Sequence, residues 1–360
     1  MKTSLETALD NLTQSALQLE LPEPDDSLTL LASGDDELLK VIDAASFFRR
    51  KYFSNLVKLN YLVNIKSGFC PEDCVYCSQA KHSSADILRY PFIDTQTLMQ
   101  EVQGAVKAGA TRICMVASGR GPNKHDIEKV SMMVKEIKHS YPFVEICTSL
   151  GILASEQADD LKEAGVFAYN HNLNTSSDRY EHICSTHTYE DRQNTVMTAK
   201  SSSLSPCSGA IFGMGETDMD IINLAEDLRL LQPESVPVNF LLPFEGTPLA
   251  GINSLTPGRC LRILSLLRFY FPNVEIRAGA GREVHLRSLQ SLSLHVVNSI
   301  FIGDYLTSEG QPHERDMEMI RDAGFIPVSH ENKAVLATDS KHVAKVKVDS
   351  RKRGPGSISD

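Results

Sequence analysis

The sequence predicts an α/β fold in which a parallel sheet closes into a (β/α)8 barrel. Short runs rich in β-branched residues alternate along the chain with longer amphipathic stretches, an order that is typical of parallel β-α units. The chain has 360 residues, 42% of them hydrophobic, which is enough for one large core. A doubly wound open sheet is the alternative. No Gly-x-Gly-x-x-Gly motif follows the first strand, which weakens that alternative.

Eight candidate strands support the barrel. They lie at residues 62–65, 112–117, 144–149, 168–173, 207–212, 236–242, 274–278 and 299–302. Helical patterns occupy intervals between them, at residues 97–108, 126–139, 155–164, 221–231 and 257–270. Eight strands with intervening helices predict a TIM-type barrel, in which functional residues gather at the carboxyl ends of the strands.

The two ends of the chain are expected to lie outside the repeating β-α pattern. Residues 1–35 are interpreted as an N-terminal leader, in which the acidic, proline-containing stretch 22–26 breaks any early helix. The barrel domain is assigned to residues 36–330 and begins with a helical extension at 36–52. Residues 331–360 become basic and then rich in Gly, Ser and Pro, which predicts a tail that is largely disordered at its end.

The composition limits the classes of partner. A net charge of -10 argues against a nucleic-acid-binding face and favours a small-molecule partner. No stretch approaches the roughly 20 apolar residues of a membrane span, and the polar start lacks the apolar region of a signal peptide. Eight cysteines without a secretion signal indicate metal binding or catalysis in the cytoplasm, where thiols stay reduced.

Three cysteines in a C-x3-C-x2-C pattern are the strongest functional signal in the chain. Cys70, Cys74 and Cys77 offer three thiolates from one short loop, and three ligands can hold a 4Fe-4S cluster while leaving one iron open. An open iron can bind a substrate or a second cofactor. A structural zinc loop or three buried thiols are the alternatives, although structural zinc usually takes four protein ligands.

Three further cysteines fall on different predicted strands. Cys114, Cys147 and Cys207 can all point into the barrel, because side chains alternate along a strand. Arg277 lies between apolar neighbours on a fourth strand, where a buried guanidinium needs an anionic partner. These four residues suit a small iron-sulfur cluster, but small core cysteines with an ion-paired core arginine explain them equally well.

The cysteine triad carries an aromatic residue, Tyr76, just before its last member, and in this it resembles the radical S-adenosylmethionine (SAM) superfamily, in which the open iron chelates SAM. From about residue 66 to 325 the chain resembles the biotin synthase family within that superfamily. The resemblance is carried, in family order, by segments at residues 67–74, 169–173, 206–209, 213–217, 246–249, 280–283 and 298–301.

The resemblance implies an enzyme that inserts sulfur into dethiobiotin and forms biotin, the last step of biotin biosynthesis, with SAM as the source of a 5'-deoxyadenosyl radical. It implies a 4Fe-4S cluster on the triad and an auxiliary 2Fe-2S cluster on four matching residues: Cys114, Cys147, Cys207 and Arg277. It further implies a flavodoxin- or ferredoxin-type electron donor and a homodimer.

The resemblance also assigns residues to SAM. Those that match are Tyr76, Asn174, Arg192, Gly209, Ile211, Gly213 and Glu216. Tyr76 is expected beside the adenine, and Asn174 stands where some family members carry an aspartate that reaches the ribose. Read alone, the glycines form a strand-to-helix turn with Glu216 near a helix N-terminus, Tyr76 is half-buried packing, and Arg192 forms a surface ion pair.

Three asparagines near strand ends are expected to bind substrate. Asn170, Asn172 and Asn239 offer amide donors and acceptors that match a ureido ring, and in the family these positions face substrate. Without the family they are read as turn or cap residues. Cys184 and Cys260 match no family ligand and are interpreted as packing.

Two other classes of function stay open from the sequence. A different radical SAM enzyme on the same barrel needs the triad but not the second set of four residues. A non-catalytic metal-binding scaffold keeps the metal but does not cleave SAM.

Overall fold

A computed structural model describes residues 3–328, and in this range the strands form a closed parallel barrel. Its strands are β1 (Leu56–Lys66), β2 (Arg112–Ala117), β3 (Glu145–Ser149), β4 (Ala168–Asn170), β5 (Ser205–Cys207), β6 (Ala210–Phe212), β7 (Ser235–Phe240), β8 (Glu275–Ala278) and β9 (Ser299–Ile302). Within the described range β5 and β6 share one of eight strand positions, and pairing of β1 with β9 closes the barrel. The predicted fold class is confirmed.

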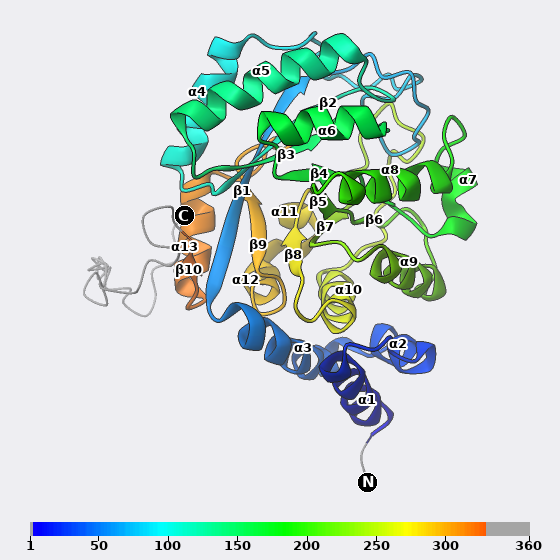
Figure 1. The fold of residues 1–360 in the computed structure, drawn as a ribbon. Coiled ribbons are helices and arrows are strands. Elements are labelled where there is room, and N and C mark those ends of the chain that lie inside the picture. The colour runs from blue at the N-terminus through cyan, green and yellow to red at the C-terminus, as the bar shows by residue number, and fades with distance from the viewer. Residues whose placement is uncertain (1–2, 329–360) are drawn as a thin grey trace, which may run out of the picture.

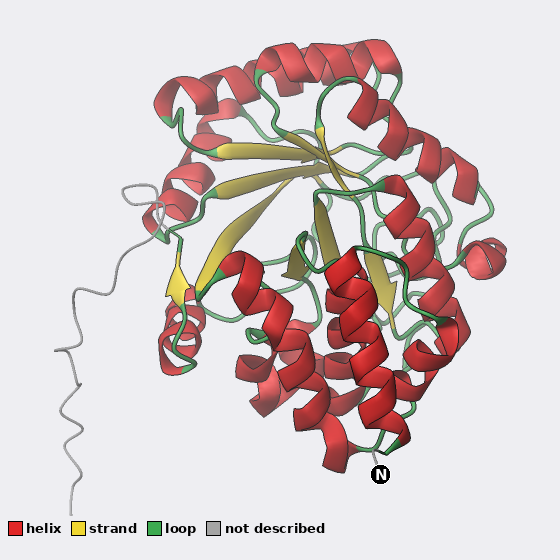
Figure 2. Cartoon of the chain, turned by 60° about the horizontal axis from the view of Figure 1, so that its bottom comes forward, coloured by secondary structure: helices red, strands yellow, loops and turns green. Residues whose placement is uncertain are grey.

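Helices surround the strands (Figures 1 and 2). The helices that follow β1 are α4 (Thr95–Lys107), α5 (Lys124–Ser140), α6 (Ser155–Ala164), α7 (Tyr180–Ile183), α8 (Tyr189–Ser201), α9 (Asp218–Leu231), α10 (Pro257–Tyr270), α11 (Arg282–Leu286), α12 (Gln290–Ser293) and α13 (His313–Asp322). Local sequence sets several of the starts. At α9, for example, the Thr217 side chain accepts from Asp220 N, and Asp220 Oδ2 accepts from Thr217 N, a reciprocal cap.

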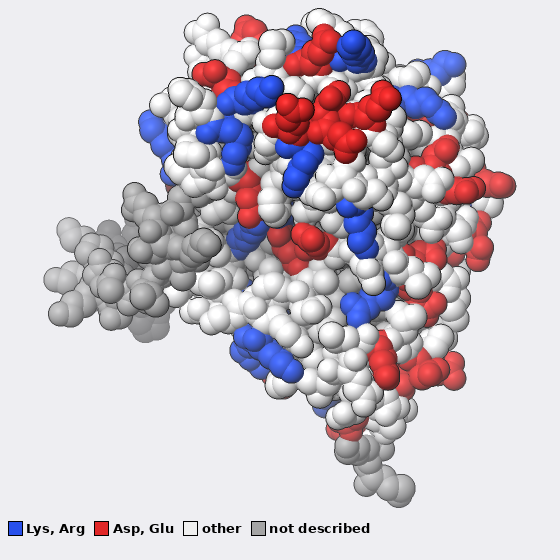
Figure 3. All heavy atoms as spheres, in the orientation of Figure 1, with Lys and Arg blue, Asp and Glu red and all other residues white. Residues whose placement is uncertain are grey.

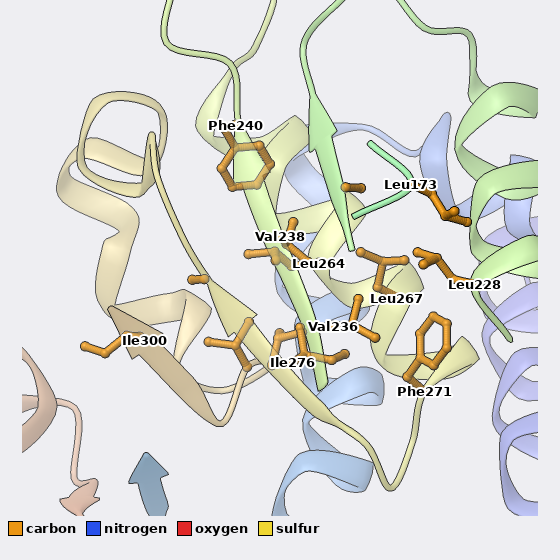
Figure 4. Packing of buried hydrophobic residues seen from close by; sticks show 14 of the residues in the cluster. Leu173, Leu228, Val236, Val238, Phe240, Leu264, Leu267, Phe271, Ile276 and Ile300 are labelled. Atoms are coloured by element: carbon orange, nitrogen blue, oxygen red, sulfur yellow. The ribbon is translucent and has the colours of Figure 1, made fainter. Parts of the chain in front are cut away.

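The core between α10 and the sheet shows how packing positions the strands. Leu264 and Leu267 lie beside the buried side chains of β7 and β8, among them Val236, Val238 and Ile276 (Figure 4). All five side chains are fully buried. Burying an aliphatic side chain of this size contributes about 1.5–3 kcal/mol. The apolar faces of strand and helix therefore hold the barrel in register.

Three helices precede the barrel and pack on α10. They are α1 (Ser4–Gln18), α2 (Pro24–Leu31) and α3 (Leu38–Phe53). The predicted break is present, because residues 19–23 separate α1 from α2, but the second half of the proline stretch belongs to α2. Leu19 ends α1 in a left-handed conformation, and Pro24 is the first residue of α2, a position that proline favours because its missing N–H is not needed there.

Arg49 attaches α3 to the amino-terminal end of the barrel. Its Nη2 donates to Leu56 O at 2.6 Å, where β1 begins, and its Nε donates to Leu294 O at 3.0 Å and to Val297 O at 3.3 Å, just before β9. The guanidinium is thus satisfied by backbone carbonyls. Because α3 is attached at the amino-terminal end of the barrel, it does not cover the loops at the carboxyl ends of the strands, where a functional site can form.

Several strands differ from their predicted extents; β4, for example, ends at Asn170 instead of residue 173. β1 begins at Leu56 instead of residue 62, and it also pairs with a short strand, β10 (Ile326–Pro327). The strand predicted at 207–212 is divided into β5 and β6. At the break, Ser208 N donates to Ser235 O at 3.1 Å and turns the backbone toward β7.

Positive and negative side chains are interspersed on the face shown in Figure 3. None of the helices in residues 3–328 is long and apolar enough to span a membrane. The predicted tail at 331–360 lies outside the described residues, and the proposed boundaries at residues 35 and 330 stay predictions.

Candidate active site and metal centres

The carboxyl end of the barrel contains a cavity of about 350 Å³. Six of the predicted metal-binding residues line it: Cys70, Cys74, Cys77, Cys114, Cys147 and Arg277. The seventh, Cys207, is fully buried behind this wall. The structure therefore brings both predicted cysteine sets to one cavity.

The loop at residues 70–77 follows β1, and backbone hydrogen bonds hold its shape. Cys77 N donates to Cys74 O at 3.1 Å, which makes a tight turn between two of the three thiols. Val75 N donates to Ile183 O at 3.0 Å and attaches the loop to α7. The three thiols are thus presented from a fixed turn and not from a freely moving segment.

Without a bound metal, the surroundings of these thiols favour their neutral form. Burial raises the pKa of Cys77 to about 11 and is also the main cause of the raised pKa of Cys70. A hydrogen bond to Cys184 raises the pKa of Cys74. Because the thiolate is the ligand form, a bound metal must offset this penalty. Three soft thiolates at this spacing fit the predicted 4Fe-4S cluster.

The second cysteine set lies deeper in the barrel. Cys114 and Cys147 are direct neighbours in the pairing of β2 with β3, and the Cys147 thiol contacts the thiols of both Cys114 and Cys207. Arg277 Nη1 lies 3.9 Å from Cys207 Sγ. All four predicted residues are therefore adjacent, and each is almost completely buried.

Charged side chains beneath these cysteines form a buried network. Arg112 Nη2 lies 2.8 Å from Glu145 Oε2, and Arg277 Nη2 lies 2.5 Å from Glu275 Oε1. Arg112 also reaches Glu275, and Lys58 contacts both carboxylates. Glu275 is thus the anionic partner that a buried Arg277 requires. Three cations facing two carboxylates leave one positive charge in excess beside the thiols.

This charge balance fits the predicted 2Fe-2S cluster. A hydrogen bond with Cys147, assisted by the Arg277 charge, lowers the pKa of Cys207 to about 5. An oxidised 2Fe-2S core bound by three thiolates carries one net negative charge, which the excess positive charge offsets while the Arg277 guanidinium stays protonated. Ligation of iron through Nη1 would require that guanidinium to lose a proton and would remove this excess charge. The Nη2 of Arg277 is held by Ser235 Oγ at 2.9 Å and by Glu275, so Nη1 is the nitrogen that faces the thiols.

The three predicted substrate asparagines all line the cavity. Asn170 Nδ2 donates to Asn172 Oδ1 at 2.9 Å, and Asn170 Oδ1 has no hydrogen-bond partner among the described residues. Asn239 accepts from Ala280 N at 3.0 Å and donates to Ala210 O at 3.2 Å. Asn239 therefore bridges neighbouring strands, as a structural asparagine does, whereas Asn170 keeps an acceptor for a ligand.

Four of the residues assigned to SAM line the same cavity: Tyr76, Asn174, Arg192 and Ile211. Asn174 Nδ2 donates to Tyr76 Oη at 2.5 Å, and Asn174 has a positive φ of 71°, a conformation that asparagine tolerates better than most residues. Arg192 Nη1 donates to Asn172 O at 2.7 Å, so this buried side chain supports the cavity wall and does not form a surface ion pair.

Gly209, Gly213 and Glu216 lie behind the residues that line the cavity. Glu216 accepts from Gly213 N at 2.6 Å and from Met214 N at 2.8 Å, which closes the turn before α9. A Cβ atom on Gly209 would lie 1.8 Å from Pro237 O, so this glycine permits close packing of β5 and β6 against β7. These contacts support the structural interpretation, and a role of the three residues toward SAM stays a prediction.

Sequence reasoning missed two residues beside the triad. Cys184 Sγ lies 3.7 Å from Cys74 Sγ and 3.2 Å from His187 Nδ1. The i, i+3 spacing of this Cys-His pair is a weak metal-ligand signal in the sequence, but its contact with a residue 110 positions away cannot be read from spacing. Cys260 is fully buried in α10, as expected for a packing residue.

Comparison with known proteins gives the family. Residues 64–228 match the Radical SAM superfamily, and residues 237–326 match the Biotin and Thiamin Synthesis associated domain. A biotin synthase from Streptomyces avermitilis is 55% identical over 317 residues, which cover 88% of this chain and 82% of the relative. The chain belongs to the biotin synthase family. A second biotin synthase, from Cutibacterium acnes, is 50% identical over 351 residues, covering 96% of this chain and 98% of the relative.

Solved structures confirm the barrel of this biotin synthase family member. Methylornithine synthase superposes with a TM-score of 0.73 at 20% identity, over 89% of this chain and 98% of that one. The FeFe-hydrogenase maturase from Carboxydothermus hydrogenoformans superposes with a TM-score of 0.76 at 15% identity, over 90% and 80%. At these identities they show the fold alone. Membership of the radical SAM superfamily implies a 4Fe-4S cluster that acts with SAM.

Proposed function

We propose that this chain acts as a biotin synthase, a sulfurtransferase that inserts sulfur into dethiobiotin and forms biotin in the last step of biotin biosynthesis. The observation that carries the proposal is the presence of two separate cysteine sets at one cavity. A different radical SAM enzyme needs only the first set. A metal-binding scaffold needs no cavity that joins the two.

Each cysteine set has a proposed occupant. Cys70, Cys74 and Cys77 would hold the 4Fe-4S cluster, and the auxiliary 2Fe-2S cluster would be held by Cys114, Cys147, Cys207 and Arg277. When bound, these groups supply, respectively, an electron for reductive cleavage of SAM and the sulfur atom that enters the product.

The side chains between the two sets would position the organic reactants. We assign the ureido ring to Asn170, whose Oδ1 can accept from a ring N–H, and to Asn172 beside it. Asn239, whose amide fixes the adjoining strands, would complete the substrate side of the cavity wall. Holding the reacting carbon of the substrate between the two cysteine sets would make its reaction with the groups bound there effectively unimolecular.

SAM would lie against the part of the wall nearest the triad. Tyr76 and Asn174 are linked by a hydrogen bond and are placed to contact the adenosine. Ile211 offers an apolar surface, and Arg192 fixes the wall through Asn172 O. Gly209, Gly213 and Glu216 would act behind them by shaping the turn. Enclosure in the barrel keeps bulk water away from reactive groups.

The partners and location are proposals that rest on the family. We infer a flavodoxin- or ferredoxin-type electron donor and a homodimer. A cytoplasmic location is supported by the state of the cysteines, because all eight are unpaired and thiols persist in that compartment.

The experiment that tests the function is anaerobic reconstitution with iron and sulfide, followed by incubation with SAM, a reductant and dethiobiotin. Mass spectrometry should detect both biotin and 5'-deoxyadenosine. Deoxyadenosine without biotin would assign the chain to another radical SAM reaction, and neither product from cluster-loaded protein would indicate a scaffold.

A further inference from the structure

His187 is a buried residue that has no part in the function proposed above. It lies between α7 and α8 and lines the cavity. Its two ring nitrogens contact different parts of the site. Nδ1 contacts the carboxylate of Glu72, a residue of the triad loop, and Nε2 lies 2.8 Å from Nη2 of Arg192 in the cavity wall. The imidazole therefore connects the triad loop to Arg192.

These two hydrogen bonds fix the position of the ring proton. Arginine is only a donor, so Nε2 of His187 accepts from Arg192. The proton of the neutral ring then lies on Nδ1, which donates to Glu72 Oε2. Because the ring accepts from one neighbour and donates to the other, it holds both in fixed orientations.

Further contacts hold Glu72 in place. Its Oε2 also accepts from Thr186 Oγ1 at 2.7 Å, and its Oε1 lies 3.4 Å from Arg120 Nη1. Lys81 N donates to the Glu72 carbonyl at 2.8 Å, which fixes the backbone of the triad loop at this point. The carboxylate that accepts from His187 is therefore a fixed anchor.

Arg192 has a charge that its neighbours do not neutralise. Its guanidinium donates to the Tyr180 hydroxyl and to the Asn172 carbonyl, besides the neutral His187 ring. Among the residues that the structure describes, no carboxylate pairs with it. The guanidinium lines the cavity, and its remaining N–H donors can bind an anionic group of a ligand. The carboxylate of SAM is such a group.

On the basis of the proposed assignment of Arg192 to SAM, we propose that His187 is a positioning residue that orients the Arg192 guanidinium for SAM binding. The contacts with Tyr180 and Asn172 leave the planar group free to rotate about the line that joins them. The third contact, with His187, removes that freedom. Because Glu72 belongs to the triad loop, the same chain of contacts fixes Arg192 relative to the three thiols.

Two substitutions separate this role from packing of the ring. The His187 ring packs edge-on against Tyr180, with ring centroids 6.0 Å apart. His187→Phe keeps an aromatic ring beside Tyr180 but can neither accept from Arg192 nor donate to Glu72. His187→Gln loses the ring, but its amide offers an acceptor and a donor for those two contacts.

The first test measures the Kd for SAM by isothermal titration calorimetry, with cluster-loaded chains of matched iron content. His187→Phe should raise the Kd roughly tenfold, and His187→Gln should keep it within about threefold of wild type. The matched control is His182→Phe, which changes an exposed histidine of α7 and should leave the Kd unchanged. Wild-type affinity in His187→Phe would assign the ring to packing and overturn the proposal.

The second test asks whether His187 acts through Arg192. Arg192→Met removes the guanidinium and should itself weaken SAM binding. In that background His187→Phe should change the Kd for SAM by less than about twofold, because no guanidinium remains to be oriented. Fold-changes that multiply in the double variant would show that His187 acts independently of Arg192, and would overturn the proposal.

Electron paramagnetic resonance separates weaker SAM binding from damage to the 4Fe-4S cluster. At saturating SAM, reduced His187→Phe should give the same signal as reduced wild type with SAM. A variant signal that SAM alters at no concentration would show that His187 acts on the cluster itself, and would overturn the proposal. These measurements do not use dethiobiotin, so a wild-type chain that binds SAM but forms no biotin would refute only the proposed function.

Discussion

Arg277 Nη1 lies 3.9 Å from Cys207 Sγ, while Nη2 of the same guanidinium is held by Glu275 and Ser235. The side chain is therefore anchored on one nitrogen and presents the other to the three deep thiols. The side chain is thus held beside the thiols, with Glu275 as its charge partner, and a cluster bound by these thiols would meet Nη1 without movement of the arginine.

The first prediction concerns Arg277. Arg277→Lys keeps the positive charge but replaces the planar guanidinium, with its two Nη groups, by a single ammonium group. The auxiliary cluster should therefore still assemble, but with an altered absorption and Mössbauer spectrum. Arg277→Met should also destabilise the protein by about 1–3 kcal/mol, because Glu275 loses its nearest partner while Arg112 and Lys58 remain. An auxiliary-cluster spectrum identical to wild type in both variants would exclude Arg277 as a ligand.

The second prediction separates the two cysteine sets. Cys77→Ser should abolish 5'-deoxyadenosine and biotin together, because SAM cleavage depends on the triad. Cys147→Ser should abolish biotin but retain the 4Fe-4S signal and deoxyadenosine formation. Iron and sulfide analysis of both variants provides the control for cluster content. Biotin formation by Cys147→Ser at the wild-type rate would contradict the assignment of the deeper set.

The sequence predicts that the cysteines form two groups, the triad and the deeper set, because each group depends on a pattern within short segments of the chain. The triad spacing lies within eight residues, and the proximity of Cys114, Cys147 and Cys207 follows from placing them on different strands of one barrel, whereas their role as cluster ligands came from the family resemblance. Once strands are parallel and in register, cysteines at equivalent depth must meet. The pairing of Cys114 with Cys147 shows this directly.

Other features of the site depend on contacts between distant segments. Nothing local to Cys184 indicates that Asp73 binds the next two residues of its chain and brings it to Cys74. The network around Arg112 likewise joins the first residues of three strands. The break at the early proline stretch was predicted, but the helix that follows was missed because Pro24 begins it.

The third prediction concerns Asn174, which donates to Tyr76 and has a positive φ. Asn174→Ala removes the hydrogen bond and places alanine in a strained conformation, so KM for SAM should rise about 5–30-fold. Asn174→Asp retains an acceptor for a ribose hydroxyl and tolerates the backbone, so its KM should stay close to wild type. Steady-state kinetics at matched 4Fe-4S content measures this. Equal KM values for the alanine variant and wild type would remove Asn174 from the SAM site.

The fourth prediction concerns stability. Arg282 Nη2 lies 2.7 Å from Asp316 Oδ1, and both side chains are fully buried between α11 and α13. Asp316→Asn leaves the buried guanidinium with Glu283, 3.0 Å away, as its remaining carboxylate partner and should cost about 1–3 kcal/mol, seen as a lower urea midpoint. The matched control is Asp43→Asn, which breaks the exposed pair with Arg50 and should cost at most about 1 kcal/mol. A similar small loss in both variants would show that the buried pair is not important for folding.

The most direct test of the auxiliary cluster as sulfur donor is to follow the sulfur atom. The auxiliary cluster is reconstituted with isotopically heavy sulfide, excess sulfide is removed, and a single turnover with SAM, reductant and dethiobiotin is analysed by mass spectrometry. We expect the biotin formed to carry the heavy sulfur and the auxiliary-cluster absorption to fall in proportion. Unlabelled biotin from a chain whose auxiliary cluster stays intact would contradict this role of the cluster.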